Sequence, residues 1–485
     1  MTENTSTRAP VDPESTAALA ANGLELTLLD TSPANTANTA NTASTANTAM
    51  LRRWILAESR GFHEPEPSDE RLAGQAAEIA GDRVTAVWDQ TAADPQTPVA
   101  TIRSWVMGLT VPGGAALPAW AISSVTVSPT HRRRGVARAL LGGELRAAAR
   151  EGLAMAMLTV SEATIYARYG FGPAVHQADY VIDSTRAVWT GPVPAGRVQF
   201  VSPESLLVDG RALFERTRTL SPGEVDRRPN VWAHRLGLNP RHPGASTQDL
   251  RAVRFDDAAG VPQGFALYTV AITGNSFPAR LTLTDLVAAT DDASAALWRF
   301  LLEMDLVTEI NAPQRSVSEP VAWQIADRRA VRKVDESDHL WLRILDVPAA
   351  LAARSYAAAD DFVLDVTDDL GFAAGRFAFS TTTTTSTTTT TTDAAGRAHP
   401  LPATTGSAPE TRDTAEPADP AEPAGPAAPA ALALTVADLG SLYLGGASAT
   451  ELVRAGRVRE LTPGAAARLD AVMRTELPPY LSTGF

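Results

Sequence analysis

Apolar runs and helical periodicities alternate through the first third of the chain. Three apolar runs predict strands, at residues 82–89, 99–112 and 119–129. The third run ends at Pro129, and small or apolar residues then recur at Val136, Ala139, Leu140 and Gly143, which is the spacing of one helix face. A strand at 153–161 and a short helix at 162–170 are predicted next. Strands that alternate with helices in this way indicate an α/β layer.

The next part of the chain repeats this order of elements. Residues 263–272 and 279–289 predict strands, and residues 291–305 predict a helix. The joint "DLVAATDDASAALWRFLL" follows the same strand–turn–helix pattern as "VTVSPTHRRRGVARALL" of the first part, but Asp291 and Asp292 stand where the first joint has arginines. We interpret this as an internal duplication in which only one copy kept its basic joint.

The last part of the chain begins with a strand that leads into a helix. Asp346 is the predicted N-cap of that helix, and Pro348 lies in its first turn. Further strands are predicted at 360–369 and 372–379. The pattern divides the chain into three blocks, at 23–185, 186–335 and 336–485.

Three other segments are predicted to lie outside the packed blocks. Residues 1–22 are expected to form a flexible tail. An Ala-Asn-Thr repeat at 32–50 and a threonine-rich, then Pro/Ala-rich, tract at 380–430 are expected to be disordered insertions. The two insertions hold too few large apolar side chains to offset the entropy cost of ordering them.

The overall charge and composition exclude several functional classes. The chain has a formal net charge of −13, which argues against nonspecific binding to nucleic acid. It contains no cysteine, so thiolate nucleophiles and thiolate metal sites are excluded, and its seven histidines form no metal-ligand spacing. No apolar run approaches the ~20 residues of a membrane helix, and the N-terminus does not resemble a signal peptide. We therefore expect a cytoplasmic protein that binds neither metal nor membrane.

Against this acidic background, the first strand–helix joint is strongly basic. The first N–H groups of a helix have no partner within it, and they point outward with the positive end of the helix dipole behind them. Positive charge is added there by Arg132, Arg133, Arg134 and Arg138, and Gly135 allows the backbone to approach a ligand. The joint therefore predicts a cradle for a phosphate group, and a pyrophosphate suits it well. The alternatives are a solvated basic face, a nucleic-acid patch and a targeting segment.

Several motifs resemble one known family. "V-x-V-x-P-x-x-R-R-x-G-V-A" is similar to the acyl-CoA binding motif of the GCN5-related N-acetyltransferases. Together with "SE..IY.R.GFGPA", "LWLRI..VPAALAARSY" and "LGSLYLGG", it resembles the enhanced intracellular survival (Eis) acetyltransferases. The resemblance implies an α/β (α+β) chain with two tandem acetyltransferase domains, the second without its own cofactor site, followed by a domain similar to sterol carrier proteins. It also implies acetyl-CoA as co-substrate and a homohexameric assembly.

The resemblance assigns roles to individual residues around the basic joint. In the family, the strand before the joint separates from its neighbour and binds the pantetheine arm, and the turn holds the pyrophosphate. The implied cofactor-binding residues are Val125, Thr126, Val127, Arg133, Arg134, Gly135, Val136, Ala137, Arg138, Ser161 and Glu162. Ser161 and Glu162 have simpler alternative roles, as an N-cap and as a partner of the helix dipole.

Transfer of an acetyl group to an amine requires a proton acceptor for the amine and a proton donor for the leaving thiolate. Tyr166 is the candidate acid, because a phenol of pKa ~10 stays protonated at neutral pH. The alternative is a half-buried structural tyrosine. The candidate base, implied by the resemblance alone, is the carboxylate of Phe485, which would otherwise be a frayed end.

The segment "FHEPEPSDE" at 62–70 is a candidate border of the amine pocket, with Phe62 and Glu64 as the residues of interest. Its alternative is a solvated acidic loop. The sequence thus predicts an N-acetyltransferase for a cationic amine of the aminoglycoside, lysine or polyamine type. Two rivals remain: acetylation of one protein lysine or N-terminus, and a lipid or sterol carrier in which the acetyltransferase domains are a scaffold.

Overall fold

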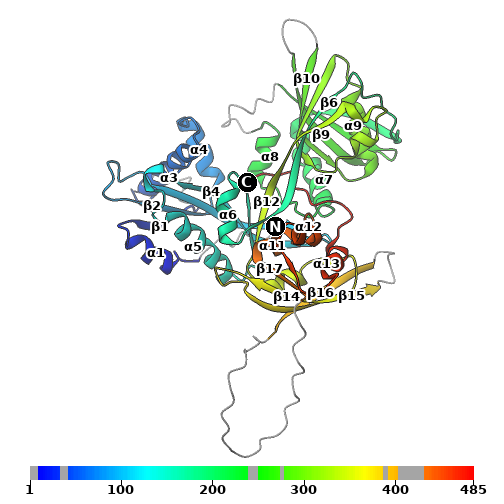
Figure 1. Ribbon diagram of the computed structural model, residues 1–485. Helices are drawn as coiled ribbons and strands as arrows, with labels where there is room; N and C mark the ends of the chain where they lie inside the picture. Colours follow the sequence, from blue (N-terminus) through cyan, green and yellow to red (C-terminus); the bar gives the residue numbers. More distant parts are fainter. Residues whose placement is uncertain (1–8, 33–41, 239–248, 273–277, 386–391, 402–430) are drawn as a thin grey trace, which may run out of the picture.

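The computed structural model describes residues 9–32, 42–238, 249–272, 278–385, 392–401 and 431–485. Within them, one large mixed sheet of twelve strands runs through two α/β domains, and a second sheet of six strands forms a third domain (Figure 1). The predicted fold class is confirmed. No helix among the described residues is long and apolar enough to span a membrane.

The first domain consists of one half of the large sheet with helices on both faces. Its strands are β1 (Glu25–Leu29), β2 (Arg83–Trp88), β3 (Ala100–Thr110), β4 (Ala116–Val127) and β5 (Met155–Thr159). Its helices are α1 (Pro13–Ala20), α3 (Thr42–Gly61), α4 (Asp69–Glu78), α5 (Val136–Arg150) and α6 (Ala163–Tyr166). The predicted helical face of α5 is buried, with Val136, Leu140 and Leu141 in the core.

The second domain repeats the order of the first, as the duplicated pattern predicts. Its strands are β7 (Gly196–Val201), β8 (Leu250–Asp257), β9 (Pro262–Ile272), β10 (Ala279–Ala288) and β11 (Val307–Ser316). Its helices are α7 (Asp209–Arg218), α8 (Pro229–Arg235) and α9 (Asp291–Leu302). Trp298 of α9 is fully buried among Phe255, Leu281 and Ile310 of the sheet.

Two long strands, β6 (Gly172–Asp183) and β12 (Val331–Ile344), join the two domains into one sheet. The strand order is β1-β2-β3-β4-β5-β12-β6-β11-β10-β9-β8-β7. The last residues of β12 pair with β5 of the first domain, from Leu340 with Thr159 to Ile344 with Met155. Its first residues pair with the end of β6, which in turn pairs with β11. The expected boundary at 335 therefore lies inside a strand that serves both halves.

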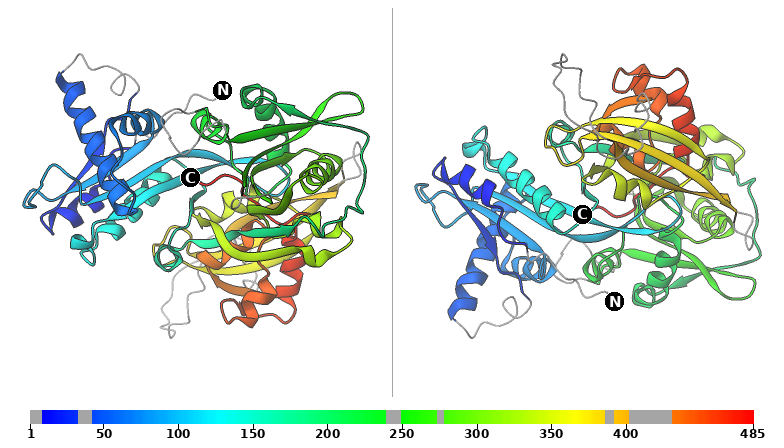
Figure 2. Two further views of the ribbon diagram at one scale, coloured as in Figure 1. Left: turned by 90° about the horizontal axis from the view of Figure 1, so that it is seen from above. Right: turned by 90° about the horizontal axis from the view of Figure 1, so that it is seen from below.

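The third domain packs against this junction (Figure 2). Its sheet has the order β13-β16-β15-β14-β17-β18. The strands are β13 (Ser355–Tyr356), β14 (Asp360–Thr367), β15 (Gly375–Thr385), β16 (Thr392–Leu401), β17 (Leu432–Thr435) and β18 (Arg459–Glu460). The helices are α10 (Val347–Ala352), α11 (Val436–Tyr443), α12 (Ala449–Arg454) and α13 (Ala465–Met473). As predicted, Asp346 caps α10 by accepting a hydrogen bond from the Ala349 N–H, and Pro348 lies in the first turn.

The expectation of a flexible tail at 1–22 is wrong for residues 9–22. Asp12 caps α1, and the Ser15 hydroxyl donates a hydrogen bond to the Ala139 carbonyl oxygen of α5. A Cβ at Gly143 would lie 2.7 Å from the Ser15 oxygen, so the glycine in α5 allows this close approach. Leu19 is buried in the core. The burial of Leu19 and the capped helix order this segment in spite of its polar composition. Residues 1–8 lie outside the described part of the chain.

The prediction of two disordered insertions is also only partly correct. Residues 42–50 of the first insertion form the start of α3, which continues into the buried apolar residues Leu51, Trp54 and Ile55. Residues 380–385 of the second belong to β15, and 392–401 form β16, its antiparallel partner. Threonine is β-branched and suits a strand, so a low-complexity tract still extends a hairpin. Residues 33–41, 386–391 and 402–430 lie outside the described residues.

Candidate active site

The strands β4 and β5 separate at the centre of the first domain. Their parallel pairing joins Trp120 to Ala156 and Ala121 to Met157 and stops there, although β4 continues to Val127. A bulge bends β4 at this point, because its register with β3 shifts and Ser124 has a φ of 55°. The backbone of residues 125–127 therefore faces a gap between strands, where a ligand with amide groups can pair with it. Val125 and Val127 are half-buried beside this gap, and Thr126 turns to the other face, where its hydroxyl bonds Thr101.

The predicted anion cradle lies directly after this gap. Arg133 has a φ of 62° and Gly135 a φ of 75°, and α5 begins at Val136 with no side chain capping it. Alternating left-handed residues of this kind turn consecutive N–H groups toward one point. A Cβ at Gly135 would meet nothing within 4 Å, so the loop is open on that side. The free helix N-terminus and the exposed Arg132 and Arg133 fit a pyrophosphate.

One of the predicted arginines points elsewhere. The Arg134 guanidinium donates a hydrogen bond to the Asn22 carbonyl oxygen at 3.0 Å and lies 4.0 Å from the Asp89 carboxylate. His131 also bonds Asp89, at 3.0 Å. The hydrogen bond from His131 lowers the pKa of Asp89. This group fixes the base of the loop, while Arg138 lies exposed on the first turn of α5.

Tyr166 lies at the end of the short helix α6, which follows β5. Its ring is 7% exposed and contacts Phe171 edge-on, with 6.2 Å between ring centroids. Burial raises the pKa of Tyr166, and the nearby Glu162 carboxylate adds to this shift, while a hydrogen bond with Ser161 opposes it. The phenol is therefore protonated at neutral pH, as an acid must be. Glu162 rather than Ser161 occupies the N-cap position, so the alternative role of Ser161 as N-cap does not apply, whereas the Glu162 carboxylate remains close to the positive end of the helix dipole.

Phe485, the last residue, lies beside the end of β5. This is the strand that precedes the helix of Tyr166. The Thr159 hydroxyl donates a hydrogen bond to the Phe485 carbonyl oxygen. The Phe485 ring contacts Trp105 edge-on, with 5.8 Å between ring centroids. Both views in Figure 2 show the chain end at the junction of the domains rather than extended into solvent. Phe485 therefore lies beside the last residue of β5, and α6 begins four residues further along the chain.

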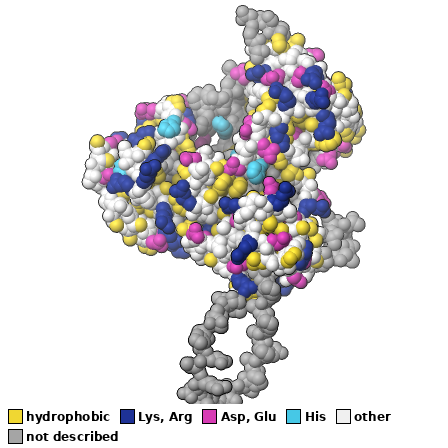
Figure 3. Space-filling view, viewed as in Figure 1, with side chains coloured by type: hydrophobic (Ala, Val, Ile, Leu, Met, Phe, Trp, Pro, Cys, Tyr) yellow, Lys and Arg dark blue, Asp and Glu magenta, His cyan; other side chains and the backbone are white. Residues whose placement is uncertain are grey.

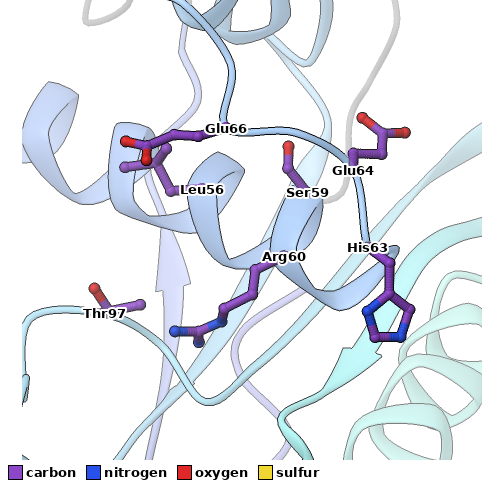
Figure 4. A pocket seen from close by; sticks show the side chains of 7 residues that line it. All are labelled: Leu56, Ser59, Arg60, His63, Glu64, Glu66 and Thr97. Carbon is purple, nitrogen blue, oxygen red and sulfur yellow. The ribbon is translucent and has the colours of Figure 1, made fainter.

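Phe62 and Glu64 lie just beyond the end of α3. Phe62 is exposed, and the Glu64 carboxylate pairs with Arg71 at 2.7 Å. A pocket of about 480 Å³ opens beside them, between α3, the segment after it and the loop before β3 that carries Thr97 (Figure 4). The lining residues are Leu56, Ser59, Arg60, His63, Glu64, Glu66 and Thr97. Glu64 is part of this pocket wall, whereas Phe62 is not among its lining residues.

The sequence analysis missed Glu58, a carboxylate on the face of α3 that meets β4. The Ser124 hydroxyl at the bulge donates a hydrogen bond to it at 3.0 Å. Burial raises the pKa of Glu58. Its position was readable in the sequence, because Leu51, Trp54 and Glu58 fall on one helical face, and a carboxylate on an apolar face is unusual.

Basic and acidic side chains are interspersed on the face seen in Figure 3. Among the described residues, no cluster of histidine and carboxylate side chains could hold a metal ion.

Comparisons with known proteins agree with this geometry. Models of an acetyltransferase (GNAT) domain match residues 42–174 and 223–344, and a model of a sterol carrier protein domain matches residues 347–482. An uncharacterized N-acetyltransferase of Streptomyces avermitilis is 34% identical over 435 residues, which cover 88% of this chain and 94% of that protein. The N-acetyltransferase Eis of Mycobacterium tuberculosis is 32% identical over 382 residues, which cover 76% and 81%.

A solved structure shows the same architecture over most of the chain. The crystal structure of Eis1 from Mycobacterium abscessus superposes with a TM-score of 0.71 at 28% identity and covers 95% of this chain and all of that one. The fold and the separated strands above a basic loop are those of a GCN5-related acetyltransferase, so the protein is an N-acetyltransferase that uses acetyl-CoA. Within that class, the chain belongs to the Eis family.

Proposed function

We propose that the protein transfers the acetyl group of acetyl-CoA to an amino group of a cationic amine, of the aminoglycoside, lysine or polyamine type. The observation that supports this most directly is the meeting of three parts at the end of β5. These are the gap between β4 and β5, the buried phenol of Tyr166, and Phe485 hydrogen-bonded to Thr159.

The cofactor supplies an acetyl thioester, and the residues of this chain hold and polarise it. The N–H groups near Arg133 and Gly135, with the Arg133 and Arg138 side chains, bind the pyrophosphate. The free edge of β4 at residues 125–127 pairs with the pantetheine amides and offers N–H groups to the developing oxyanion. Arg134 keeps the loop in shape through Asn22 and Asp89.

Proton transfers at the amine nitrogen and at the thiolate sulfur complete the proposed reaction. An alkyl amine is almost fully protonated at pH 7, so it must lose a proton before its nitrogen can attack the thioester carbon. The carboxylate of Phe485 attracts the ammonium group and accepts that proton. When the carbon–sulfur bond breaks, the Tyr166 hydroxyl donates its proton to the leaving thiolate. The acetylated nitrogen then gives up the second proton that the amide product does not keep, and this proton restores the Tyr166 phenol through solvent. Glu64 and Glu66 line the pocket beside α3, where their carboxylates can pair with a cationic acceptor.

A direct test follows free thiol with acetyl-CoA and a panel of amines. Release that depends on the amine supports the proposal, whereas co-purified lipid without amine-dependent release would support the lipid-carrier function instead. A peptide extension after Phe485 should lower kcat by about 100-fold or more, because it replaces the carboxylate with a neutral amide. The same extension at the N-terminus serves as the control, and equal activity of the two would remove Phe485 from the mechanism.

The family resemblance also implies a cytoplasmic homohexamer. Light scattering on the purified protein measures this assembly directly, and a monomer in solution would contradict it.

A further inference from the structure

The second domain contains the same kind of strand separation as the first. β10 pairs in parallel with β11 from Ala279 to Thr282, and then continues alone on that side to Ala288. Its register with β9 shifts between Leu283 and Asp285, which is where a bulge bends β4 in the first domain. The second domain therefore has a gap between strands, here called its cleft, at the place that corresponds to the proposed cofactor site of the first.

This second cleft is filled by buried charged side chains of the domain itself. Arg315 of β11 reaches across the gap, with its Nη1 atom 3.5 Å from the Leu286 carbonyl oxygen of β10, and it pairs with Glu319 at 3.1 Å. Asp285 lies at the bulge and pairs with Arg227 at 2.6 Å. Neither side chain of this second pair is more than 2% exposed. The space that a pantetheine arm would need is therefore taken.

The C-terminal segment lies along this filled cleft. The Tyr480 hydroxyl donates to the Gln314 carbonyl oxygen at 2.9 Å, and the Tyr480 N–H donates to the Pro222 carbonyl oxygen at 2.8 Å. Further along, the Ser482 N–H donates to the Glu224 carboxylate at 3.0 Å. These contacts hold the chain five and three residues before Phe485, so the second domain fixes the path by which the chain end reaches the first.

Arg227 is the centre of this arrangement. Its guanidinium donates to both Asp285 oxygens, to the Ser482 hydroxyl at 2.7 Å and to the Thr483 hydroxyl at 2.9 Å. The group also lies over the Phe214 ring, 4.0 Å from its centroid. Burial alone would lower the pKa of Arg227, but the Asp285 carboxylate outweighs it, so the guanidinium stays charged. The pKa of Asp285 is lowered in turn, because Arg227 and Arg235 outweigh the effect of burial.

The segment that carries Arg227 is also attached to the first domain. The Thr110 N–H at the end of β3 donates to the Glu224 carbonyl oxygen at 2.8 Å. Arg228 pairs with Asp82 of the first domain at 2.9 Å. A single short stretch of chain thus holds the C-terminal segment on one side and the sheet of the first domain on the other.

We propose that Arg227 is a positioning residue for the reaction, and that the filled cleft of the second domain holds residues 480–483 so that the Phe485 carboxylate stays at the end of β5. This inference rests on the proposed function, in which that carboxylate accepts the proton of the amine. Only Gly484 separates Thr483 from Phe485, and two residues span at most about 7 Å. A chain end held at Thr483 therefore has little freedom to leave the site.

The test combines Arg227→Met with removal of residues 484–485. We expect each change alone to lower kcat, the Arg227 variant by roughly 10- to 100-fold, with little change in the Kd for acetyl-CoA. In the combined variant, Arg227→Met should cost little more than the truncation alone, because the shortened chain ends at Thr483 and no longer brings a carboxylate to the end of β5. A role in general stability would give an independent further loss instead.

Two further variants keep the test valid if Arg227→Met folds poorly. Thr483→Val removes the 2.9 Å hydrogen bond and leaves the Arg227–Asp285 pair in place, and it should lower kcat by a few-fold. Arg254→Met is a matched control, since Arg254 pairs with Asp256 and Asp209 in the same domain, and neither carboxylate contacts residues 480–485 in the structure. It should lower the melting temperature but not kcat.

The outcomes separate the two proposals. If the truncation leaves kcat unchanged, the proposed role of Phe485 is wrong, and the positioning role fails with it. If the truncation lowers kcat but Arg227→Met and Thr483→Val do not, or if their losses add to that of the truncation, only the positioning role is wrong.

Discussion

The two strand–helix joints share one backbone plan and differ in what satisfies the helix N-terminus. At the second joint, the Thr290 side chain caps α9 by accepting the Ala293 N–H, and Asp291 and Asp292 lie in the first turn. At the first joint, α5 begins after Gly135 with no side-chain cap. A hydroxyl cap and carboxylates in the first turn satisfy the N–H groups of a helix and repel an anion. An uncapped helix leaves its N–H groups available to an anionic ligand.

The segments that follow the fifth strand of each domain extend this comparison. "SEATIY" at 161–166 follows β5, and "SEPVAW" at 318–323 follows β11 at the same spacing. Tyr166 is 7% exposed beside the cleft, whereas Trp323 at the corresponding place is 72% exposed and stacks on Arg328. The second copy has therefore lost both the anion cradle and the phenol, and it has kept the fold.

The largest effect is expected when the phenol is removed from the first copy. Tyr166→Phe should lower kcat by about 10²- to 10³-fold, because the leaving thiolate then lacks its proton donor. The Kd for acetyl-CoA, measured by calorimetry, should change little. Trp323→Tyr restores a phenol to the second copy and should add no activity, since its cleft is filled. Unchanged kcat in the Tyr166 variant would show that another group donates the proton.

A somewhat smaller effect is expected when the charge of the first joint is reversed. Arg133→Glu combined with Arg138→Glu should weaken acetyl-CoA binding by about 100-fold, because two charge-assisted contacts to the pyrophosphate become repulsions. The reciprocal change, Asp291→Arg with Asp292→Arg, should leave the stoichiometry at one cofactor per chain, since Arg315 and Asp285 still fill the second cleft. A second bound cofactor would show that charge alone separates the two joints.

Periodicity and turn chemistry predicted the architecture well where side chains act locally. The helix face at Val136 and Leu140, the Asp346 cap and the duplicated joint are all short-range patterns, and the structure contains them. The joining of the two domains into one sheet by β6 and β12 was not predictable, because strand pairing over long sequence separations leaves no local pattern. The folded part of the N-terminal segment was missed because composition alone does not show a single anchoring residue such as Leu19.

Only the parts of the candidate site that lie within the sequence motifs could be predicted. The left-handed Arg133 and Gly135 agree with the expected cradle, but the direction of the Arg134 side chain depends on Asn22 and Asp89, which lie far away in the sequence. Similarly, the Arg227–Asp285 pair unites side chains 58 residues apart with the chain end. Such contacts are set by the tertiary fold, so no local spacing could reveal them.

The smallest expected effect is a pH dependence of stability that arises from a histidine on β12, one of the strands that join the two copies. His339 of β12 is 7% exposed and lies beside Gly484, and burial lowers its pKa to about 4, with Arg235 adding to the shift and Asp338 opposing it. An unfolded histidine has a pKa of ~6.5, so the unfolded chain binds this proton first as the pH falls. This group should therefore lower the free energy of unfolding by about 2 kcal/mol between pH 7 and pH 5. Urea denaturation of His339→Gln should lack this loss, whereas His63→Gln, at an exposed histidine, should retain it. An equal acid dependence in the His339 variant would show that other groups cause the loss.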